Sequence, residues 1–595
     1  MLNENFIPTI SNIRQGYLNG DFTPRQLVSL LQLRAQKYTD RNIWISQINT
    51  ELLECYLSHL ESLPVDSLPL YGIPFAAKDN IDVQGFSTTA GCPEYAFDPV
   101  NSAHITAALI SAGAIPLGKT NLDQFATGLV GTRSPHGPCA NAFDPDYISG
   151  GSSSGSAVAV SLGLVSFSLG TDTAGSGRVP AMLNNLIGLK PSRGLFSMSG
   201  VVPACRSLDC PSIFAFTTED AALVFETAAV ADTNDAYSRP NPFSNSVRSF
   251  GATPPPPRIG VPLPEQREFY GEVDAEQLFE SAIAKWQSLG AEIIEVDFTP
   301  LLDAARLLYE GPWVAERYAA LEDLIETTPD VIHPVVRGIV ESANGKSAVD
   351  TFKAEYQMQE YRTYANSLFK KVDLLLTPTA PRHYLIDDLL KDPVRLNSNM
   401  GHYTNFMNLL DLCGVAIPAG FLPTGLPFGI SLVAPAFKDV AILNHASVWQ
   451  DAMALPYGAM PAQELLTHRP TPTAANPTLI DVAVCGAHLN DFPLNWQLID
   501  RGATLRQTTT TSDKYKLYLL ADFEPKRPAL IRSEEDGVAI ELEVWSVPAD
   551  ELGGFLNNIP YPLGIGKVEL SDGSWVSGFM CEGSEIEWYL FGHPS

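Results

Sequence analysis

GGSSSGS at residues 150–156 and GTDTAGSGR at residues 170–178 are the stretches that decide the fold of this 595-residue chain. Upstream of both, a single lysine interrupts an apolar run, IPFAAKDN at residues 73–80. A glycine- and serine-rich stretch alone is typical of a loop or linker, and a buried lysine paired with an acid is commoner than a catalytic one. The three pieces in this order, with helix-like apolar segments between them, instead indicate one functional site.

Together the three pieces resemble the amidase signature family, whose catalytic device is a Ser–Ser–Lys triad. Ser152 precedes Ser176 by 24 positions, the separation of the bridging and nucleophilic serines in that family. The resemblance covers roughly residues 20–460. It implies an α/β fold with a central mixed sheet covered by helices. It assigns Ser176 as nucleophile, Ser152 as the bridge, in a cis peptide, and Lys78 as the base.

The proposed base must be uncharged, because an ammonium cannot accept a proton. A serine hydroxyl is a poor nucleophile until a base takes its proton. Burial of Lys78 among Ile73, Phe75 and Ala77 would lower its pKa, since desolvation disfavours the charged form. A GxSxG pattern around Ser153 lacks the strand–turn–helix context of a nucleophile elbow.

The loop before the nucleophile is a candidate oxyanion hole. Thr173, Ala174 and Gly175 supply consecutive backbone amides, which are the donors that a tetrahedral intermediate needs. Most family members carry glycine where this chain has Ala174, so we expect a hole narrowed by one methyl group. Asp172 and Arg178 are expected to support the loop rather than to catalyse.

Composition excludes several classes of function. The formal net charge is −29, which argues against nucleic-acid binding and against docking on an anionic membrane. Eight scattered cysteines without a CxxC pair, and an N-terminus unlike a signal peptide, predict a cytoplasmic protein with reduced thiols. No metal-binding or GxGxxG motif occurs, so neither metal nor cofactor is expected. GAIPLGKT at residues 113–120 matches the P-loop pattern, which we interpret as chance.

The chain divides into two predicted domains: an amidase domain over residues 1–465 and an α+β domain over residues 480–595, joined by a Pro- and Thr-rich linker at residues 466–479. Thr23 and Pro24 are typical of a helix start. Residues 275–330 and 345–371 are predicted to be helical. The strands expected in the second domain are Ile480–Val484, Tyr515–Ala521, Val538–Val547 and Trp575–Cys581.

The segment LLYEGPWVAER at residues 307–317 resembles a signature of allophanate hydrolases. In that family a tyrosine and an arginine eight residues apart hold the substrate, which implies Tyr309 and Arg317 here. If the segment is helical, the two lie about two turns apart on similar faces. Allophanate is urea carrying a carboxylate, and a guanidinium can grip a carboxylate with two hydrogen bonds. The alternative is that Arg317 pairs with Glu310 or Glu316 on a solvated helix.

The tail also resembles the C-terminal domain of allophanate hydrolases, similar in fold to γ-glutamylcyclotransferase-like proteins, in segments such as VAVCGAHL at residues 482–489. This resemblance suggests decarboxylation of N-carboxycarbamate in the second domain, with His488 assisting protonation. The alternatives are unaided decarboxylation and a domain that serves as a dimer or partner surface around a buried, satisfied histidine.

The leading hypothesis is a cytoplasmic allophanate hydrolase of urea degradation, acting on a small anionic amide and releasing ammonia and carbon dioxide. One alternative is hydrolysis of another amide, such as malonamate, biuret or a fatty amide. Another is an amidotransferase-like component that supplies ammonia within a complex. By family, a homodimer is expected. A urea carboxylase is expected as a separate protein, because no biotin-type segment occurs in the chain.

Overall fold

The computed structural model describes residues 2–461, 479–520 and 523–582. The chain forms two compact units. The first takes Met1–Asn241 and Thr253–Thr471, and the second takes Pro242–Ala252 and Pro472–Ser595. The predicted linker lies outside the described residues except for Leu479, which begins the first strand of the second unit.

An eleven-stranded mixed sheet forms the centre of the first unit, in the order β1-β3-β2-β4-β6-β5-β10-β11-β9-β7-β8. The predicted mixed sheet is therefore confirmed. Parallel pairs join β3, β2 and β4 at one end and β9, β7 and β8 at the other, and the strands between them pair antiparallel. The strands are β1 (Trp44–Gln47), β2 (Pro74–Lys78), β3 (Ile115–Thr120), β4 (Phe167–Asp172), β5 (Ile187–Lys190), β6 (Cys210–Ala215), β7 (Arg258–Pro262), β8 (Glu292–Val296), β9 (Leu374–Pro378), β10 (Leu412–Phe421) and β11 (Pro427–Pro435).

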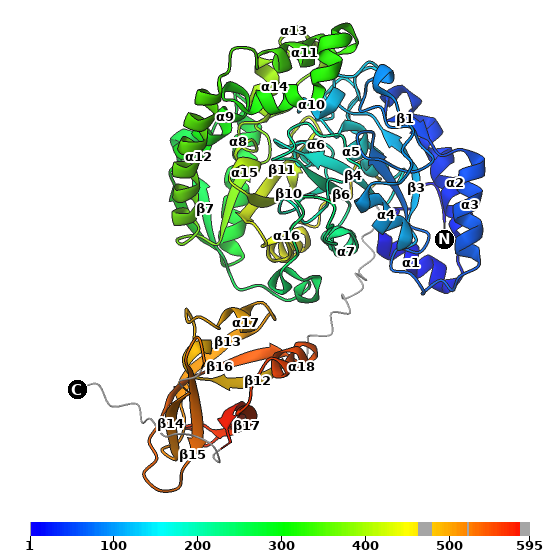
Figure 1. The fold of residues 1–595 in the computed structure, drawn as a ribbon. Coiled ribbons are helices and arrows are strands. Elements are labelled where there is room, and N and C mark those ends of the chain that lie inside the picture. The colour runs from blue at the N-terminus through cyan, green and yellow to red at the C-terminus, as the bar shows by residue number, and fades with distance from the viewer. Residues whose placement is uncertain (1, 462–478, 521–522, 583–595) are drawn as a thin grey trace. The chain divides into compact units, whose positions relative to one another are not determined.

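Helices surround this sheet, with α1–α3 near the end that carries β1 and α8, α9 and α12 near the end that carries β7 (Figure 1). They are α1 (Ile10–Asn19), α2 (Pro24–Ala35), α3 (Thr50–Glu61), α4 (His104–Ser111), α5 (Ser154–Ser161), α6 (Val179–Leu183), α7 (Thr218–Ala228), α8 (Val273–Ser288), α9 (Thr299–Glu310), α10 (Trp313–Thr327), α11 (Pro334–Glu341), α12 (Ala348–Leu368), α13 (Ile386–Lys391), α14 (Arg395–Met400), α15 (Phe406–Leu409) and α16 (Asp439–Met453).

Local sequence explains several of these elements. Thr23 caps α2 as predicted, since its side chain accepts from the Gln26 backbone N–H and the Gln26 side chain accepts from the Thr23 N–H. Every residue of β2 and of β4 is buried, as expected for strands covered on both faces. Phe75 and Phe167 stack between these neighbouring strands, with ring centroids 5.3 Å apart.

One prediction about elements was incomplete, and one interpretation agrees with the structure. Residues 275–330 are not helical throughout, because β8 lies between α8 and α9 and pairs in parallel with β7. Glu292 and Glu295 are exposed and only Val296 is buried, which suits an edge strand, and the flanking helical patterns concealed it. The 113–120 segment, whose P-loop match we interpreted as chance, forms a turn at Gly113 and then the buried strand β3, and it is not a phosphate loop.

The second unit holds a five-stranded sheet in the order β13-β16-β12-β18-β17 and a two-stranded sheet of β14 and β15. The four predicted strands are present with small shifts of boundary, and β13, β15 and β17 were missed. The elements are β12 (Leu479–Val484), α17 (Trp496–Ile499), β13 (Thr504–Thr510), β14 (Tyr515–Leu520), β15 (Arg527–Arg532), β16 (Glu541–Pro548), α18 (Ala549–Asn557), β17 (Leu563–Glu569) and β18 (Trp575–Cys581).

Candidate active site

Sheet topology gathers the three predicted catalytic residues. β2 and β4 are parallel neighbours, so their carboxyl ends lie at the same edge of the sheet. Lys78 is the last residue of β2, and the loop after β4 carries Ser176. Ser152 precedes α5, which packs against both strands. The fold therefore brings Ser152, 74 residues beyond Lys78, into hydrogen-bond contact with that lysine, and it places the loop of Ser176 at the same edge of the sheet. Among the described residues no hydrogen bond joins Ser176 to Ser152 or to Lys78.

Lys78 is fully buried and hydrogen-bonded to two hydroxyls. Its Nζ lies 2.7 Å from Ser152 Oγ and 2.8 Å from Thr171 Oγ1. Burial lowers the pKa of Lys78 to about 7, against partial opposition from the nearby carboxylates of Asp123, Asp209 and Asp172. A substantial fraction of the amine is therefore neutral near physiological pH, as the sequence predicted from the apolar run.

Ser152 is held by Asp123, a residue for which the sequence indicated no role. The Gly151–Ser152 peptide is cis, as the family resemblance implied. The Asp123 N–H donates to the Ser152 carbonyl at 3.1 Å. The Asp123 carboxylate accepts from the backbone N–H groups of Val130, Gly131 and Arg133. A Cβ added at Gly151 would lie 2.1 Å from Asp123 Oδ2, so only glycine fits there.

A buried ion pair, between one residue before the Ser176 loop and one after it, holds this loop in place. Asp172 and Arg178, both fully buried, form two hydrogen bonds of 2.9 and 3.0 Å, and Asp172 also accepts from the Gly177 N–H. Their predicted supporting contacts are thus present. The Ser176 hydroxyl donates to the Gly128 carbonyl at 3.4 Å. Among the described residues, this is its one hydrogen bond.

Thr173, Ala174 and Gly175 have distinct environments. The Thr173 hydroxyl donates to Asp209. Ala174 belongs to a buried hydrophobic cluster with Leu308 and Trp313, so its methyl group also has a packing role. Gly175 has φ of +145°, and a Cβ there would come within 2.4 Å of Thr404 Oγ1. Glycine is thus required directly before Ser176.

Tyr309 and Arg317 meet, although not on one helix as we expected. α9 ends at Glu310, and α10 begins at Trp313 after a break at Gly311 and Pro312. The bend places the Arg317 guanidinium over the Tyr309 ring, 5.3 Å from its centroid. A Gly-Pro pair is a strong signal for a break, and it was visible in the sequence.

Arg317 is buried and forms no salt bridge among the described residues, although the carboxylates of Asp209 and Glu316 lie close enough to favour its charged form. In the described ranges no ion pair joins it to Glu310 or Glu316, which was the alternative role considered for it. Its Nη1 donates to Thr127 Oγ1 at 3.1 Å, and its Nε has no hydrogen-bond partner in the same ranges. Thr127 directly precedes Gly128, the residue that accepts from Ser176. The predicted nucleophile and the predicted anion-binding arginine therefore contact consecutive residues of one loop.

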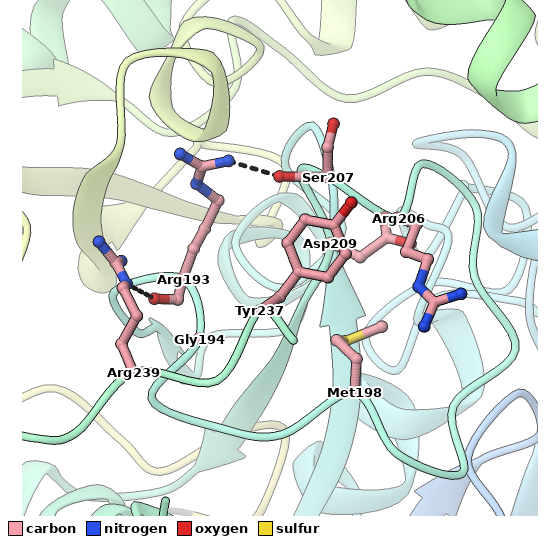
Figure 2. A pocket seen from close by; sticks show the side chains of 8 residues that line it. All are labelled: Arg193, Gly194, Met198, Arg206, Ser207, Asp209, Tyr237 and Arg239. Carbon is pink, nitrogen blue, oxygen red and sulfur yellow. Dashed lines mark hydrogen bonds between the residues drawn. The ribbon is translucent and has the colours of Figure 1, made fainter. Parts of the chain in front are cut away.

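Asp209 and Glu316 are further polar residues at the site. Sequence reasoning missed Asp209 and considered Glu316 only as a partner of Arg317. Asp209 accepts from Thr173, and burial raises the pKa of Asp209 to about 6. Glu316, next to Arg317 on α10, accepts from Ser207 and Cys205. A pocket includes Asp209 and its neighbours Arg206 and Ser207 in its wall (Figure 2). Its lining residues are Arg193, Gly194, Met198, Arg206, Ser207, Asp209, Tyr237 and Arg239.

His488, the candidate of the second unit, lies within an aromatic cluster. Its ring stacks on Phe579 at 5.0 Å and contacts Phe555 edge-on at 5.7 Å. Nε2 lies 3.1 Å from Gln497 Oε1, and burial lowers the pKa of His488. This packing favours a neutral imidazole and is compatible with the alternative of a satisfied core histidine.

Other reactive groups do not form a second centre in the described part of the chain. No group of three or more His, Cys, Asp or Glu residues there could hold a metal ion. All eight cysteines are free, and Cys55 is the exposed one. Across the same residues, no helix is long and apolar enough to cross a membrane.

Comparison with known proteins places this geometry in a family. Residues 27–443 match the amidase family, and residues 480–589 match the allophanate hydrolase C-terminal domain. The chain belongs to the amidase family. The amidase match covers the Lys78, Ser152 and Ser176 cluster together with Tyr309 and Arg317.

Relatives of the amidase-family chain include two kinds of enzyme. The urea amidolyase of Lachancea kluyveri is 44% identical over 95% of this chain and 31% of its own length. A component of the glutamyl-tRNA(Gln) amidotransferase of Chromohalobacter salexigens is 31% identical over 75% of this chain and 96% of that protein. Our chain thus spans about a third of the urea amidolyases that it matches.

A solved structure extends the likeness over both units. The selenomethionine-substituted allophanate hydrolase of Kluyveromyces lactis is 41% identical, with a TM-score of 0.75. The match covers 97% of this chain and 95% of that one. The amidase fold and the presence of a second domain are thereby confirmed, whereas the resemblance to γ-glutamylcyclotransferase-like proteins stays a prediction.

Proposed function

We propose that this chain hydrolyses allophanate, with Ser176 as nucleophile, Ser152 as proton relay and Lys78 as base. The observation that carries the substrate assignment is Arg317: a buried guanidinium with an unpaired Nε, tied through Thr127 to the loop that accepts from Ser176. A buried, partly unsatisfied cation favours an anionic ligand, because a carboxylate would satisfy its remaining donors.

The reaction begins when neutral Lys78 withdraws a proton from Ser152, which takes one from Ser176. The Ser176 oxygen attacks the amide carbonyl of allophanate, and the backbone amides of the 173–176 loop stabilise the oxyanion. The proton passes to the leaving nitrogen as the C–N bond breaks, and ammonia departs. Water then cleaves the acyl-enzyme and releases N-carboxycarbamate, which loses carbon dioxide twice and yields a second ammonia.

The first test measures steady-state ammonia release from allophanate. We expect Ser176→Ala to lower kcat by at least about a thousandfold, as removal of a catalytic nucleophile does in serine hydrolases. Full activity of that variant would refute the assignment of the nucleophile.

The second test addresses the substrate. Arg317→Ala should raise KM for allophanate by roughly 10- to 150-fold, the range expected when a charged hydrogen-bonded pair is lost, and should spare small neutral amides. Arg306→Ala, which removes an exposed arginine of α9, is the matched control. Malonate, a small dicarboxylate, should bind in a crystal between Ser176 and Arg317. Equal loss with neutral and anionic amides would contradict an anionic substrate.

The second unit is proposed to assist decarboxylation of N-carboxycarbamate, with His488 taking a proton from solvent and passing it to the leaving nitrogen as the C–N bond breaks and carbon dioxide departs. His488→Gln, which keeps a polar group of similar size, should leave ammonia release in the first step intact and slow release of carbon dioxide. An unchanged rate of carbon dioxide release would favour spontaneous decarboxylation and a structural role for the residue.

The supply of allophanate requires a reaction that carboxylates urea, so a functional link to a urea carboxylase is part of the proposal. The urea amidolyase relatives are about three times as long as the matched region, which leaves room for further activities in those proteins. An amidotransferase-like role is the second candidate, favoured by the likeness to the amidotransferase component. Ammonia release that required both ATP and a partner protein would support it.

A further inference from the structure

A short segment before β6 connects the two halves of the candidate site. We call residues 204–209, ACRSLD, the 204–209 strap. At its end, Asp209 Oδ1 accepts from the Thr173 hydroxyl in the loop that carries Ser176. Asp209 Oδ2 accepts from the backbone N–H groups of Ala204 and Cys205, at 2.8 and 3.0 Å. One buried carboxylate thus closes the strap on itself and holds it to the nucleophile loop.

The same strap holds the helix that carries Arg317. The Glu316 carboxylate accepts from the Ser207 N–H at 2.6 Å and from the Ser207 hydroxyl at 2.7 Å. The Cys205 thiol lies 3.0 Å from Glu316 Oε2. Because Glu316 and Arg317 are consecutive on α10, a shift of the strap would move the backbone that positions the guanidinium.

Burying the charged Asp209 carboxylate costs free energy, and the hydrogen bonds that it accepts offset that cost. Asp209 is 5% exposed, and its burial raises its pKa to about 6. All three of its partners are donors, so an asparagine there would turn an amide N–H₂ toward at least one of them. Removing an acceptor from a buried group leaves donors unsatisfied, which is the expensive way to lose a hydrogen bond.

The pocket of Figure 2 lies against the strap and shares Ser207 and Asp209 with it. There Arg193 donates to the Ser207 carbonyl, and Arg239 donates to the Arg193 carbonyl. The strap is therefore fixed by Arg193 in addition to the contacts from Thr173 and Glu316.

We propose that the 204–209 strap sets the relative position of the nucleophile loop and the anion-binding helix. Asp209 is a positioning residue for Ser176, acting through Thr173, and Glu316 is a positioning residue for Arg317. This inference rests on the proposed function for its substrate, but its geometry does not depend on which amide is cleaved.

The test compares kcat and KM for allophanate in the full chain. Asp209→Asn should lower kcat by about tenfold or more with KM within about threefold, because a displaced nucleophile slows chemistry more than binding. Glu316→Gln should raise KM by about tenfold with kcat within about threefold. Asp220→Asn, a buried aspartate that accepts from Ile10, and Glu322→Gln, an exposed glutamate of α10, are matched controls.

A second pair of variants guards against misfolding of Asp209→Asn. Thr173→Val deletes only the hydroxyl that joins the strap to the loop, and Thr173→Ser keeps it. Valine should reproduce the loss of kcat, and serine should restore at least half of it. Equal rates for the two variants would overturn the role of this hydrogen bond, as would equal changes of kcat and KM in Asp209→Asn and Glu316→Gln.

Two readouts separate this inference from the substrate assignment. An alkyl fluorophosphonate, which reacts with activated serines, should label Ser176 at least tenfold more slowly in Asp209→Asn than in Glu316→Gln. Malonate should bind at least tenfold more weakly to Glu316→Gln than to Asp209→Asn. A wild-type chain that is labelled but inactive on allophanate refutes the proposed function alone. Labelling at equal rates in the two variants refutes the proposed positioning role of the 204–209 strap.

Discussion

At the scale of single residues, the proposed chemistry depends on the protonation state of Lys78. Its pKa of about 7, lowered by burial, lies where a small change of pH alters the fraction of free base. Two hydroxyls contact the amine, and one belongs to the proposed relay, Ser152. Thr171 is the other, and it orients the amine without a charge that would hold it protonated.

Activity should therefore depend on pH in one direction. Below pH 7 Lys78 is mostly protonated and cannot act as a base, so kcat/KM should rise with pH and level off above about 7. Initial rates of ammonia release between pH 5.5 and 9 measure this. A rate that falls as pH rises through 7 would contradict a lysine base.

The free energy of unfolding should also depend on the protonation of Lys78. Between about pH 7 and 10.5, the unfolded chain binds a proton at Lys78 that the folded chain does not, so the free energy of unfolding gains a contribution that rises with pH over this window. Denaturant unfolding measures this: between pH 7 and 9.5 the free energy of unfolding should rise less in Lys78→Met than in the unmodified chain. The buried Lys119, whose pKa is also lowered, contributes equally to both proteins and cancels.

Gly151 offers a steric test of the serine cluster. Gly151→Ala would place a methyl group 2.1 Å from Asp123 Oδ2, so we expect loss of at least about 90% of kcat, because misplacement by about 1 Å costs up to a hundredfold. The matched control is Gly338→Ala in α11, where nothing lies within 4 Å of the added atom. That control should keep activity and gain about 0.5–1 kcal/mol of stability in a thermal melt.

At the scale of elements, the break between α9 and α10 is what brings Tyr309 to Arg317. A continuous helix would place residues eight apart about 12 Å apart along its axis, too far for the ring contact observed. The conformation at Gly311 is therefore needed for the proposed binding site, even though neither Gly311 nor Pro312 has a side chain suited to bind substrate.

Replacing Gly311 should accordingly weaken substrate binding. In Gly311→Ala the added Cβ would lie 2.4 Å from the Leu307 carbonyl oxygen and displace the last turn of α9, which carries Tyr309. We expect KM for allophanate to rise by about tenfold, with kcat changed less, because the damage is to binding. Steady-state kinetics decide this, and an unchanged KM would separate Tyr309 from substrate recognition.

Sequence predicted the elements and residues that have local signatures. The candidate triad was predicted from the family resemblance and its serine spacing, α2 from its cap, and the candidate Arg317 from its segment. Asp209 and Glu316 could not be found this way, since their contacts with Thr173 and Ser207 join segments 36 and 109 residues apart. The β8 edge strand was hidden for a similar reason, because only its pairing with β7 distinguishes it from the helices around it.

At the scale of the whole molecule, the net charge of −29 opposes an anionic substrate. Raising ionic strength from about 0.01 to 0.15 M shortens the Debye length from about 30 to about 8 Å and screens this repulsion. We expect kcat/KM for allophanate to rise by roughly twofold over that range, while a neutral amide stays unchanged. Initial rates in sodium chloride measure it, and a fall with salt would indicate local attraction by Arg317 that exceeds the repulsion.

The arrangement of thiols has a practical consequence. Cys205 and Cys210 beside the candidate site are buried, and burial raises their pKa values, so both should resist alkylation. Cys55, the exposed one, should react first with a maleimide dye. The chain can therefore be given a fluorescent reporter at one place that leaves the candidate site unmodified, without any cysteine being replaced.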